Sequence, residues 1–199
     1  MEMSVPAAAD LRAARMLGQR DGLALAVKSR PRHDTGALIR DKDTADLIPG
    51  VRLEPARLWP DDRGYFLEVM RRGRGLCAGW LEADLQVSAA MGYPGTIKAL
   101  HYHFRQTDLW APVLGQLQVC LVDLRVDSPA FGFCNTLFTG TLQPWQILIP
   151  PGVGHGYKVI GREPAVLVYV TDRFYDPADE GRLSFDDPAI NYDWETQHK

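Results

Sequence analysis

From about residue 49 onward, short apolar runs alternate with clusters of turn-forming residues. The runs are rich in β-branched and aromatic side chains, as in TIKALHYHF (96–104), LQVCLVDLRV (117–126) and AVLVYVTD (165–172). Pro, Gly and Asp separate them, as in PDDRG, DSPAFG and PPGVG. Short strands at roughly regular spacing, without a long helical period, are typical of all-β sandwiches and barrels. The pattern therefore predicts an all-β domain over residues 49–199.

The two ends of the chain depart from this pattern. Residues 1–48 form a predicted N-terminal extension, in which AADLRAARMLGQ (8–19) has apolar residues at helical spacing. Asp10 is a candidate N-cap and Gly18 a candidate stop, which predicts a short helix. The polar run KSRPRHDTG that follows is typical of a linker, in which we expect His33 to be exposed. The polar, proline-punctuated segment YDPADEGRLSFDDPAINYDW near the C-terminus is expected to wrap around the barrel edge.

Composition and charge argue against several classes of partner. The chain is 46% hydrophobic and 24% charged, which is ordinary for a globular domain. Its formal net charge of −3 gives no bulk field that would attract nucleic acid. It has no apolar run of about 18 residues, so we expect no membrane span. Asp10, Arg12 and Arg15 interrupt the N-terminus where a signal peptide would be continuously apolar.

The cysteines are few and widely separated. Cys77, Cys120 and Cys134 are odd in number and form no C-x-x-C pair. This argues against both a disulfide framework and a thiolate zinc site. We therefore expect a cytoplasmic location.

Two histidines stand one residue apart in the apolar run IKALHYHFRQTD. On a strand, His101 and His103 would point to the same face of the sheet. Such a pair indicates either a metal site or a histidine that transfers protons. The wider spacing is Gly-x5-His-x-His-x4-Asp-x6-Gly from residue 95, followed by Pro-x-Gly-x-x-His ending at His155. These spacings resemble the two sequence motifs of the cupin superfamily, which implies a small jelly-roll barrel.

The histidine pattern leaves two kinds of chemistry open. Three imidazoles and one carboxylate on the inner face of a barrel would suit Fe²⁺, Mn²⁺, Ni²⁺ or Zn²⁺. Alternatively, one histidine is a base, another lines the pocket, and no metal takes part. The candidate metal ligands are His101, His103, Asp108 and His155.

Five ordered blocks give a closer resemblance. PDDRGYFLEVM, KALHYH, VDLRVDSPAFG, IPPGVGHGYKVIG and DPAINYDW occur in this order between Gly50 and Trp194. Together they resemble the dTDP-4-dehydrorhamnose 3,5-epimerase family. The resemblance implies a cupin-type jelly roll without a cofactor, a homodimer, and a nucleotide-sugar substrate. The expected reaction inverts C3, C5 or both in a dTDP-4-keto-6-deoxyhexose, within deoxysugar or cell-surface polysaccharide biosynthesis.

The resemblance also implies roles for individual residues. His101 takes the position of the catalytic base, and Tyr169, eight residues before Pro177, that of the acid. Lys98 stands where the family has an arginine and would keep a positive charge near the enolate or phosphate. The implied substrate contacts are Arg63 for the diphosphate, Phe66 and Glu68 for the nucleotide, and Gln86 and His155 for the sugar.

Three departures from the family pattern bear on mechanism. The family orients its base with an aspartate in a segment that follows the final tryptophan, whereas only ETQHK follows Trp194 here. His103 replaces a glutamine, and Asp108 falls near the place of a lysine. A metal-dependent cupin enzyme, an oxygenase or isomerase, therefore stands as the alternative to the epimerase. A sugar-binding or scaffolding cupin without turnover is a third interpretation.

Overall fold

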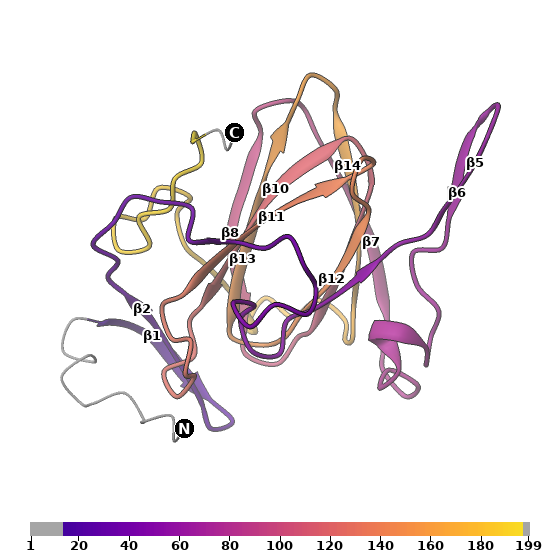
Figure 1. The fold of residues 1–199 in the computed structure, drawn as a ribbon. Helices are drawn as coiled ribbons and strands as arrows, with labels where there is room; N and C mark the ends of the chain where they lie inside the picture. The colour runs from indigo at the N-terminus through magenta and orange to yellow at the C-terminus, as the bar shows by residue number, and fades with distance from the viewer. Residues whose placement is uncertain (1–13, 197–199) are drawn as a thin grey trace.

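Two β-sheets pack face to face in the computed structural model, which describes residues 14–196 (Figure 1). The six-stranded sheet has the order β15 (Glu180–Arg182), β8 (Ile97–His103), β13 (Val153–Ile160), β10 (Gln116–Asp123), β11 (Cys134–Gly140), β3 (Ala37–Leu38). The five-stranded sheet has the order β4 (Arg52–Pro55), β12 (Trp145–Ile149), β9 (Asp108–Leu114), β14 (Ala165–Thr171), β7 (Gln86–Gly92). The predicted all-β fold is confirmed.

Apolar side chains from both sheets meet in the space between them. Leu117, Val119 and Leu121 alternate along β10, and each is fully buried. Ile147 and Ile149 of β12 pack into the same cluster from the other sheet. The alternation follows from the period of two along a strand, which sends every second side chain into the core. This core occupies the part of the sandwich next to the site described below.

Two hairpins lie outside the sandwich. β5 (Leu58–Asp61) and β6 (Gly64–Leu67) form a ribbon that projects from the barrel, and a short 3₁₀ helix, η2 (Gly75–Cys77), follows it (Figure 1). β1 (Ala14–Arg20) pairs with β2 (Leu23–Lys28) near the N-terminus. Leu25 and Val27 of β2 are buried in a second cluster, so this hairpin is packed against the barrel.

The short helix expected over residues 8–19 is wrong where the structure describes it. Ala14–Arg20 is strand β1, and residues 8–13 lie outside the described part of the chain. The turn Asp21–Gly22, with φ of 48° and 84°, reverses the chain so that β1 and β2 can pair. Glycine and aspartate tolerate this left-handed conformation, which a two-residue hairpin turn requires. Pairing with β2 therefore overrides the local helical spacing.

The C-terminal segment follows the barrel edge, as expected. β15 extends the six-stranded sheet beside β8, and the stretch after it packs Ile190, Tyr192 and Trp194 into the second cluster. All three cysteines are free and buried, in agreement with the absence of a disulfide framework. Within residues 14–196, no helix is long and apolar enough to cross a membrane. The cytoplasmic location stays a prediction, as does the division at residue 48.

Candidate active site

A cavity of about 520 Å³ opens between the two sheets. The six-stranded sheet lines it through strands β8, β13 and β15, and the five-stranded sheet through β7, β9 and β14. Five residues with an implied catalytic or sugar-binding role line this cavity, namely Gln86, Lys98, His101, His155 and Tyr169. Residues far apart in the sequence are therefore brought to one site.

His101 and Tyr169 reach the cavity from opposite walls. His101 lies on β8 of the six-stranded sheet, and Tyr169 lies on β14 of the five-stranded sheet. The His101 side chain is 37% exposed, so its ring is accessible from the cavity. An imidazole and a phenol on opposite sides of one space can act on opposite faces of a ligand bound between them.

The environment of His101 favours its neutral form. Burial lowers the pKa of His101 below its ordinary value of 6.5, and the neighbouring His155 lowers it further. Glu180 acts in the opposite direction, because its carboxylate stabilises the imidazolium. A histidine that is neutral near pH 7 has a free lone pair and can accept a proton from carbon.

Lys98 and Gln86 lie at the margin of the cavity. Lys98 is exposed, and its ammonium donates a hydrogen bond to the Met91 carbonyl at 3.4 Å. The Gln86 side-chain oxygen accepts a hydrogen bond from the Tyr175 backbone at 2.9 Å, which holds the loop after β14 against β7. Lys98 therefore places a positive charge at the margin of the cavity.

A buried polar network forms the floor of the cavity. The Gln106 amide donates to Asp108 Oδ1 at 2.7 Å and lies 3.2 Å from His103 Nε2. The Trp110 indole donates to Asp108 Oδ2 at 3.2 Å. His155 Nδ1 lies 2.9 Å from the Val153 carbonyl, which can only accept, so this nitrogen carries the proton. Nearly every polar group on the floor therefore has a partner.

Part of the predicted metal set comes together within this network. Ligand atoms of His103, Asp108 and His155 lie within 4.8 Å of one another, and all three residues are buried. His101 does not belong to this group, so the predicted four-residue set is only partly assembled. Two imidazoles and a carboxylate could hold a divalent ion. In the structure, however, the Gln106 amide nitrogen already makes hydrogen bonds to both His103 Nε2 and Asp108 Oδ1.

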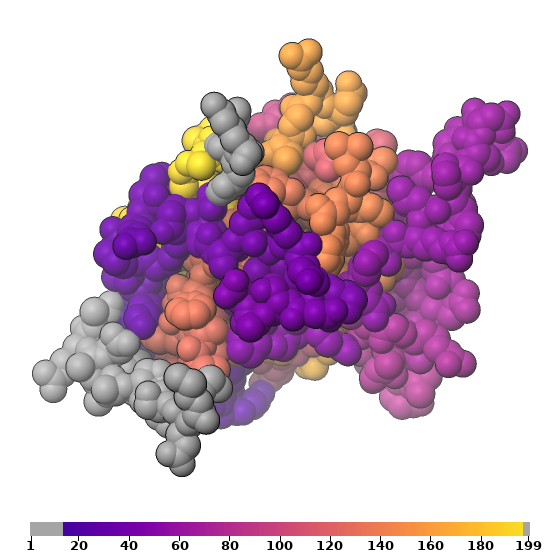
Figure 2. Space-filling model, in the orientation of Figure 1, coloured from indigo at the N-terminus to yellow at the C-terminus, as the bar shows by residue number. Residues whose placement is uncertain are grey.

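Three implied substrate contacts lie away from the cavity of their own chain. Arg63 is 82% exposed and pairs with Asp61 at 2.5 Å on the β5–β6 hairpin. Phe66 is 67% exposed, and its ring centroid lies 5.7 Å from that of Trp59. Glu68 pairs with a neighbouring surface arginine just after β6. The hairpin stands clear of the surrounding surface in the space-filling view (Figure 2).

The structure also adds residues that the sequence did not single out. Glu180 and Arg182 line the cavity from β15, and Tyr157 lines it from β13. The Tyr157 hydroxyl is buried and has no hydrogen-bond partner among the described residues. One signal was available for Tyr157, because it follows His155 by two residues on a strand and so shares its face. No comparable signal existed for Glu180 and Arg182, whose position depends on strand register.

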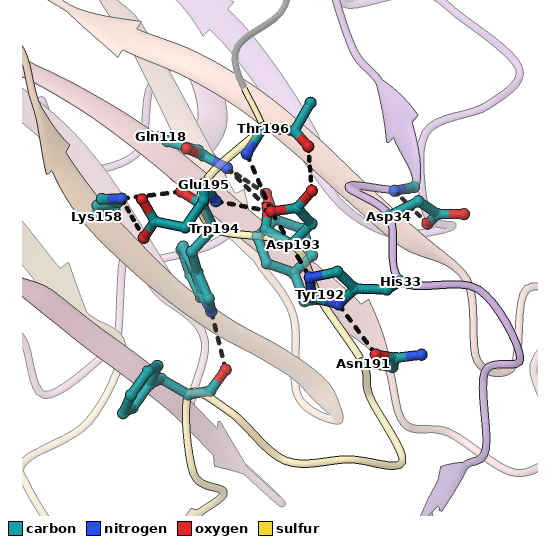
Figure 3. Close-up of polar contacts among 12 residues, drawn as sticks. His33, Asp34, Gln118, Lys158, Asn191, Tyr192, Asp193, Trp194, Glu195 and Thr196 are labelled. Carbon is teal, nitrogen blue, oxygen red and sulfur yellow. Dashed lines mark hydrogen bonds and ion pairs between the residues drawn. The ribbon is translucent and has the colours of Figure 1, made fainter.

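Asp193, next to the final tryptophan, makes its polar contacts with the C-terminal segment and His33 (Figure 3) and does not line the cavity. Its carboxylate accepts backbone hydrogen bonds from Glu195 and Thr196 at 2.8 and 3.0 Å. It also lies 3.8 Å from His33 Nε2, while His33 Nδ1 lies 3.0 Å from the Asn191 side chain. His33 is 63% exposed, as expected. Asp193 is therefore not the carboxylate beside His101.

Comparison with known proteins gives consistent matches. The family model for dTDP-4-dehydrorhamnose 3,5-epimerase matches residues 46–199. The spore coat polysaccharide biosynthesis protein SpsL of Bacillus subtilis is 41% identical over 155 residues, covering 77% of this chain and 100% of that protein. A dTDP-4-dehydrorhamnose 3,5-epimerase of Pseudomonas aeruginosa is 33% identical over 159 residues, covering 78% of this chain and 87% of that protein.

Solved structures support the same relationship. The crystal structure of a dTDP sugar isomerase from Desulfovibrio desulfuricans G20 superposes with a TM-score of 0.68 at 26% identity. The match covers 76% of this chain and 94% of that one. The family resemblance and the jelly-roll fold expected from the sequence are confirmed. The names of these relatives favour the epimerase interpretation over the metal-dependent one.

Proposed function

Because this chain belongs to the dTDP-4-dehydrorhamnose 3,5-epimerase family, we propose that it inverts C3, C5 or both of a dTDP-4-keto-6-deoxyhexose. One observation carries the proposal, namely that His101 and Tyr169 line one cavity from opposite sheets. Inversion of a carbon needs a base on one face and an acid on the other. The two side chains and the volume of the cavity, about 520 Å³, support this assignment.

The reaction proceeds by proton transfer beside the ketone. His101 removes the proton from the carbon next to C4, and the electron pair of that C–H bond passes to O4 as an enolate. The Tyr169 phenol then donates its proton to the opposite face of the carbon, and the ketone reforms. Solvent restores the phenol and takes the proton from the imidazolium, so atoms and charge balance. Lys98, at the cavity margin, stabilises negative charge on the enolate or on the diphosphate.

We propose that the β5–β6 hairpin completes the cavity of a second copy of the chain. Arg63 and Phe66 are exposed on the projecting hairpin and contribute nothing to the cavity of their own chain. The Tyr65 hydroxyl, one residue after the hairpin turn, donates a hydrogen bond to the Val113 carbonyl of the barrel, so the direction of the hairpin is fixed. β7, at the sheet edge, exposes Val87 and Met91 and offers an apolar surface for a homodimer.

Mixed dimers test this arrangement. An Arg63→Ala chain and a His101→Asn chain are each expected to be nearly inactive alone. If Arg63 acts across the dimer, mixing the two restores activity, because each mixed dimer contains one intact site. Activity that stays absent in verified mixed dimers would place Arg63 in its own chain or outside the site. Sedimentation velocity measures the dimer directly.

Solvent isotope exchange tests the function. The purified protein is incubated in D₂O with dTDP-4-keto-6-deoxyglucose, and deuterium at C3 and C5 is measured by NMR. Incorporation that depends on His101 is expected; its position shows which carbon is deprotonated, and the proton coupling constants of the product show which centre inverts. Absence of exchange at stoichiometric enzyme would reject the proposal. Stoichiometric metal that is lost in His103→Ala would instead support the metal-dependent alternative, and tight dTDP-sugar binding without exchange would support the binding cupin.

A further inference from the structure

The short strand β15 places two charged side chains beside His101. β15 pairs with β8 in antiparallel register, so that Glu180 lies opposite His103 and Arg182 lies opposite His101. Residues directly opposite one another in such a pair point to the same face of the sheet. Glu180 and Arg182 therefore face the cavity, and both line it.

The Glu180 carboxylate is shared between two partners. Oε1 accepts a hydrogen bond from Arg182 Nε at 2.6 Å, and Oε2 lies 3.6 Å from His101 Nδ1. The Glu180 side chain is only 11% exposed. A carboxylate this well buried is costly unless cations or hydrogen-bond donors satisfy it. A shift of roughly 0.7 Å would bring Oε2 and Nδ1 to hydrogen-bonding distance.

The other charged groups around His101 are not positioned to pair with its imidazole as Glu180 is. Those facing it from other strands are His155 on β13, Asp108 on β9 and Arg182 on β15; Lys98 and His103 share its own strand. Asp108 is directed to His155, with 3.5 Å between the carboxylate and Nε2. Glu180 is the carboxylate within ion-pair distance of His101 in the described part of the chain.

We propose that Glu180, on β15, is the positioning residue of the base, a role that the family resemblance gives to an aspartate on another segment. It holds the proton on His101 Nδ1, so that Nε2 keeps the lone pair that accepts the proton from carbon. Once the proton is transferred, the carboxylate stabilises the imidazolium. This inference rests on the proposed function for its kinetic consequence, but the contact itself can be tested without turnover.

Three variants separate the effects of charge. Glu180→Gln keeps the shape and removes the negative charge, so imidazolium loses its stabilisation and the pKa of His101 falls further. Arg182→Gln removes a cation that lowers the pKa of His101, so that pKa rises. Glu163→Gln, at an exposed turn outside the cavity, is the matched control. NMR titration of the His101 ring measures each pKa, and exchange kinetics as a function of pH give kcat and KM.

We expect kcat, the pKa of His101 and the pH profile to change together. Glu180→Gln lowers kcat by about 10- to 100-fold with little change in KM, and moves both the His101 titration and the acidic limb of the pH profile to lower pH. Arg182→Gln moves them to higher pH. A Glu180→Gln protein that folds normally but titrates at the wild-type pH overturns the proposal, even if kcat has fallen. If Glu180→Gln fails to fold, an unchanged titration in Arg182→Gln overturns it instead.

Failure of the proposed function is distinguishable from failure of this inference. A wild-type protein that exchanges no deuterium rejects the epimerase, while the NMR titrations still determine whether Glu180 acts on His101. A wild-type protein that exchanges deuterium, together with a Glu180→Gln variant of wild-type kcat and titration, leaves the epimerase and rejects the positioning role.

Discussion

Two buried tyrosines should respond in opposite ways to the loss of a hydroxyl. Tyr157 and Tyr192 are each 4% exposed, so Tyr→Phe removes the same atom from equally buried sites. The Tyr157 hydroxyl has no partner among the described residues, and burial raises its pKa to about 12. The Tyr192 hydroxyl lies 3.1 Å from the Gln118 amide and 2.6 Å from the Thr136 hydroxyl.

The expected changes in unfolding free energy follow from the hydrogen-bond partners of each hydroxyl. Thr136 donates its proton to the Thr35 carbonyl at 2.6 Å, so Tyr192 must donate to Thr136 while it accepts from Gln118. Removing a hydroxyl with two partners should cost about 1–2 kcal/mol of unfolding free energy. Removing a buried hydroxyl without a partner should cost nothing and could add up to about 1 kcal/mol. We expect a gap of about 2 kcal/mol between Tyr157→Phe and Tyr192→Phe.

Urea unfolding followed by tryptophan fluorescence measures the difference, since one transition midpoint and slope are obtained for each variant. In thermal unfolding the gap corresponds to roughly 4–8 °C for a chain of this size. Equal destabilisation of the two variants would refute the reasoning, because Tyr157 would then have a partner in the folded protein. Tyr157 also lines the cavity. Unchanged stability with weaker dTDP-sugar binding would identify the ligand as its partner.

Three further predictions concern the base, a buried ion pair and pH. His101→Asn should reduce deuterium exchange by about 10²- to 10⁴-fold with unchanged circular dichroism; exchange at the wild-type rate would exclude it as the base. Asp123 is fully buried and binds Arg125 at 2.7 Å, so Asp123→Ala should cost about 3 kcal/mol in urea unfolding. Asp127 is exposed in the same loop, so Asp127→Ala should change the unfolding free energy by less than about 0.5 kcal/mol. Burial lowers the pKa of His155 in the folded protein below its ordinary value of 6.5. As the pH falls, His155 is therefore protonated in the unfolded chain before it is protonated in the folded one. Stability should therefore fall as the pH drops below about 6.5 and level off below the folded pKa, with a smaller fall in His155→Gln.

Much of the barrel could be predicted because its strands are short, apolar and separated by turn residues. The runs at 96–104, 117–126 and 165–172 correspond to β8, β10 and β14. β9 was not predicted, since Asp108 and Pro112 interrupt its apolar character. Asp108 is tolerated there because Gln106 and Trp110 donate hydrogen bonds to its carboxylate within the buried network. A local pattern does not reveal such a partnership.

The N-terminal error has a similar cause. The helix was predicted from the spacing in AADLRAARMLGQ alone, whereas the Asp21–Gly22 dipeptide that follows is a strong hairpin signal between apolar segments. β2 is buried against the barrel, and Ala26 donates a backbone hydrogen bond to Leu124 at 2.9 Å. Tertiary pairing thus decides the conformation of a segment whose own preference is weak.

The site was predictable where motif spacing places residues on one strand or on a recognisable block. His101, His155 and Tyr169 were found in this way and share the cavity. Glu180 was not found, because its approach to His101 depends on which residue of β15 pairs with which residue of β8. A register shift of one residue would direct Glu180 away from the cavity.

The base and the acid belong to different sheets, and this ties the chemistry to the thickness of the sandwich. Facing sheets stand about 10 Å apart, a separation fixed by the volume of the side chains between them. Leu167, two residues before Tyr169, and Val119 are both part of that filling. Enlarging or trimming either one would widen or narrow the gap that the sugar must bridge. The hydrocarbon interior of this protein thus acts as a spacer between two reacting groups, and its volume is constrained by turnover as well as by folding.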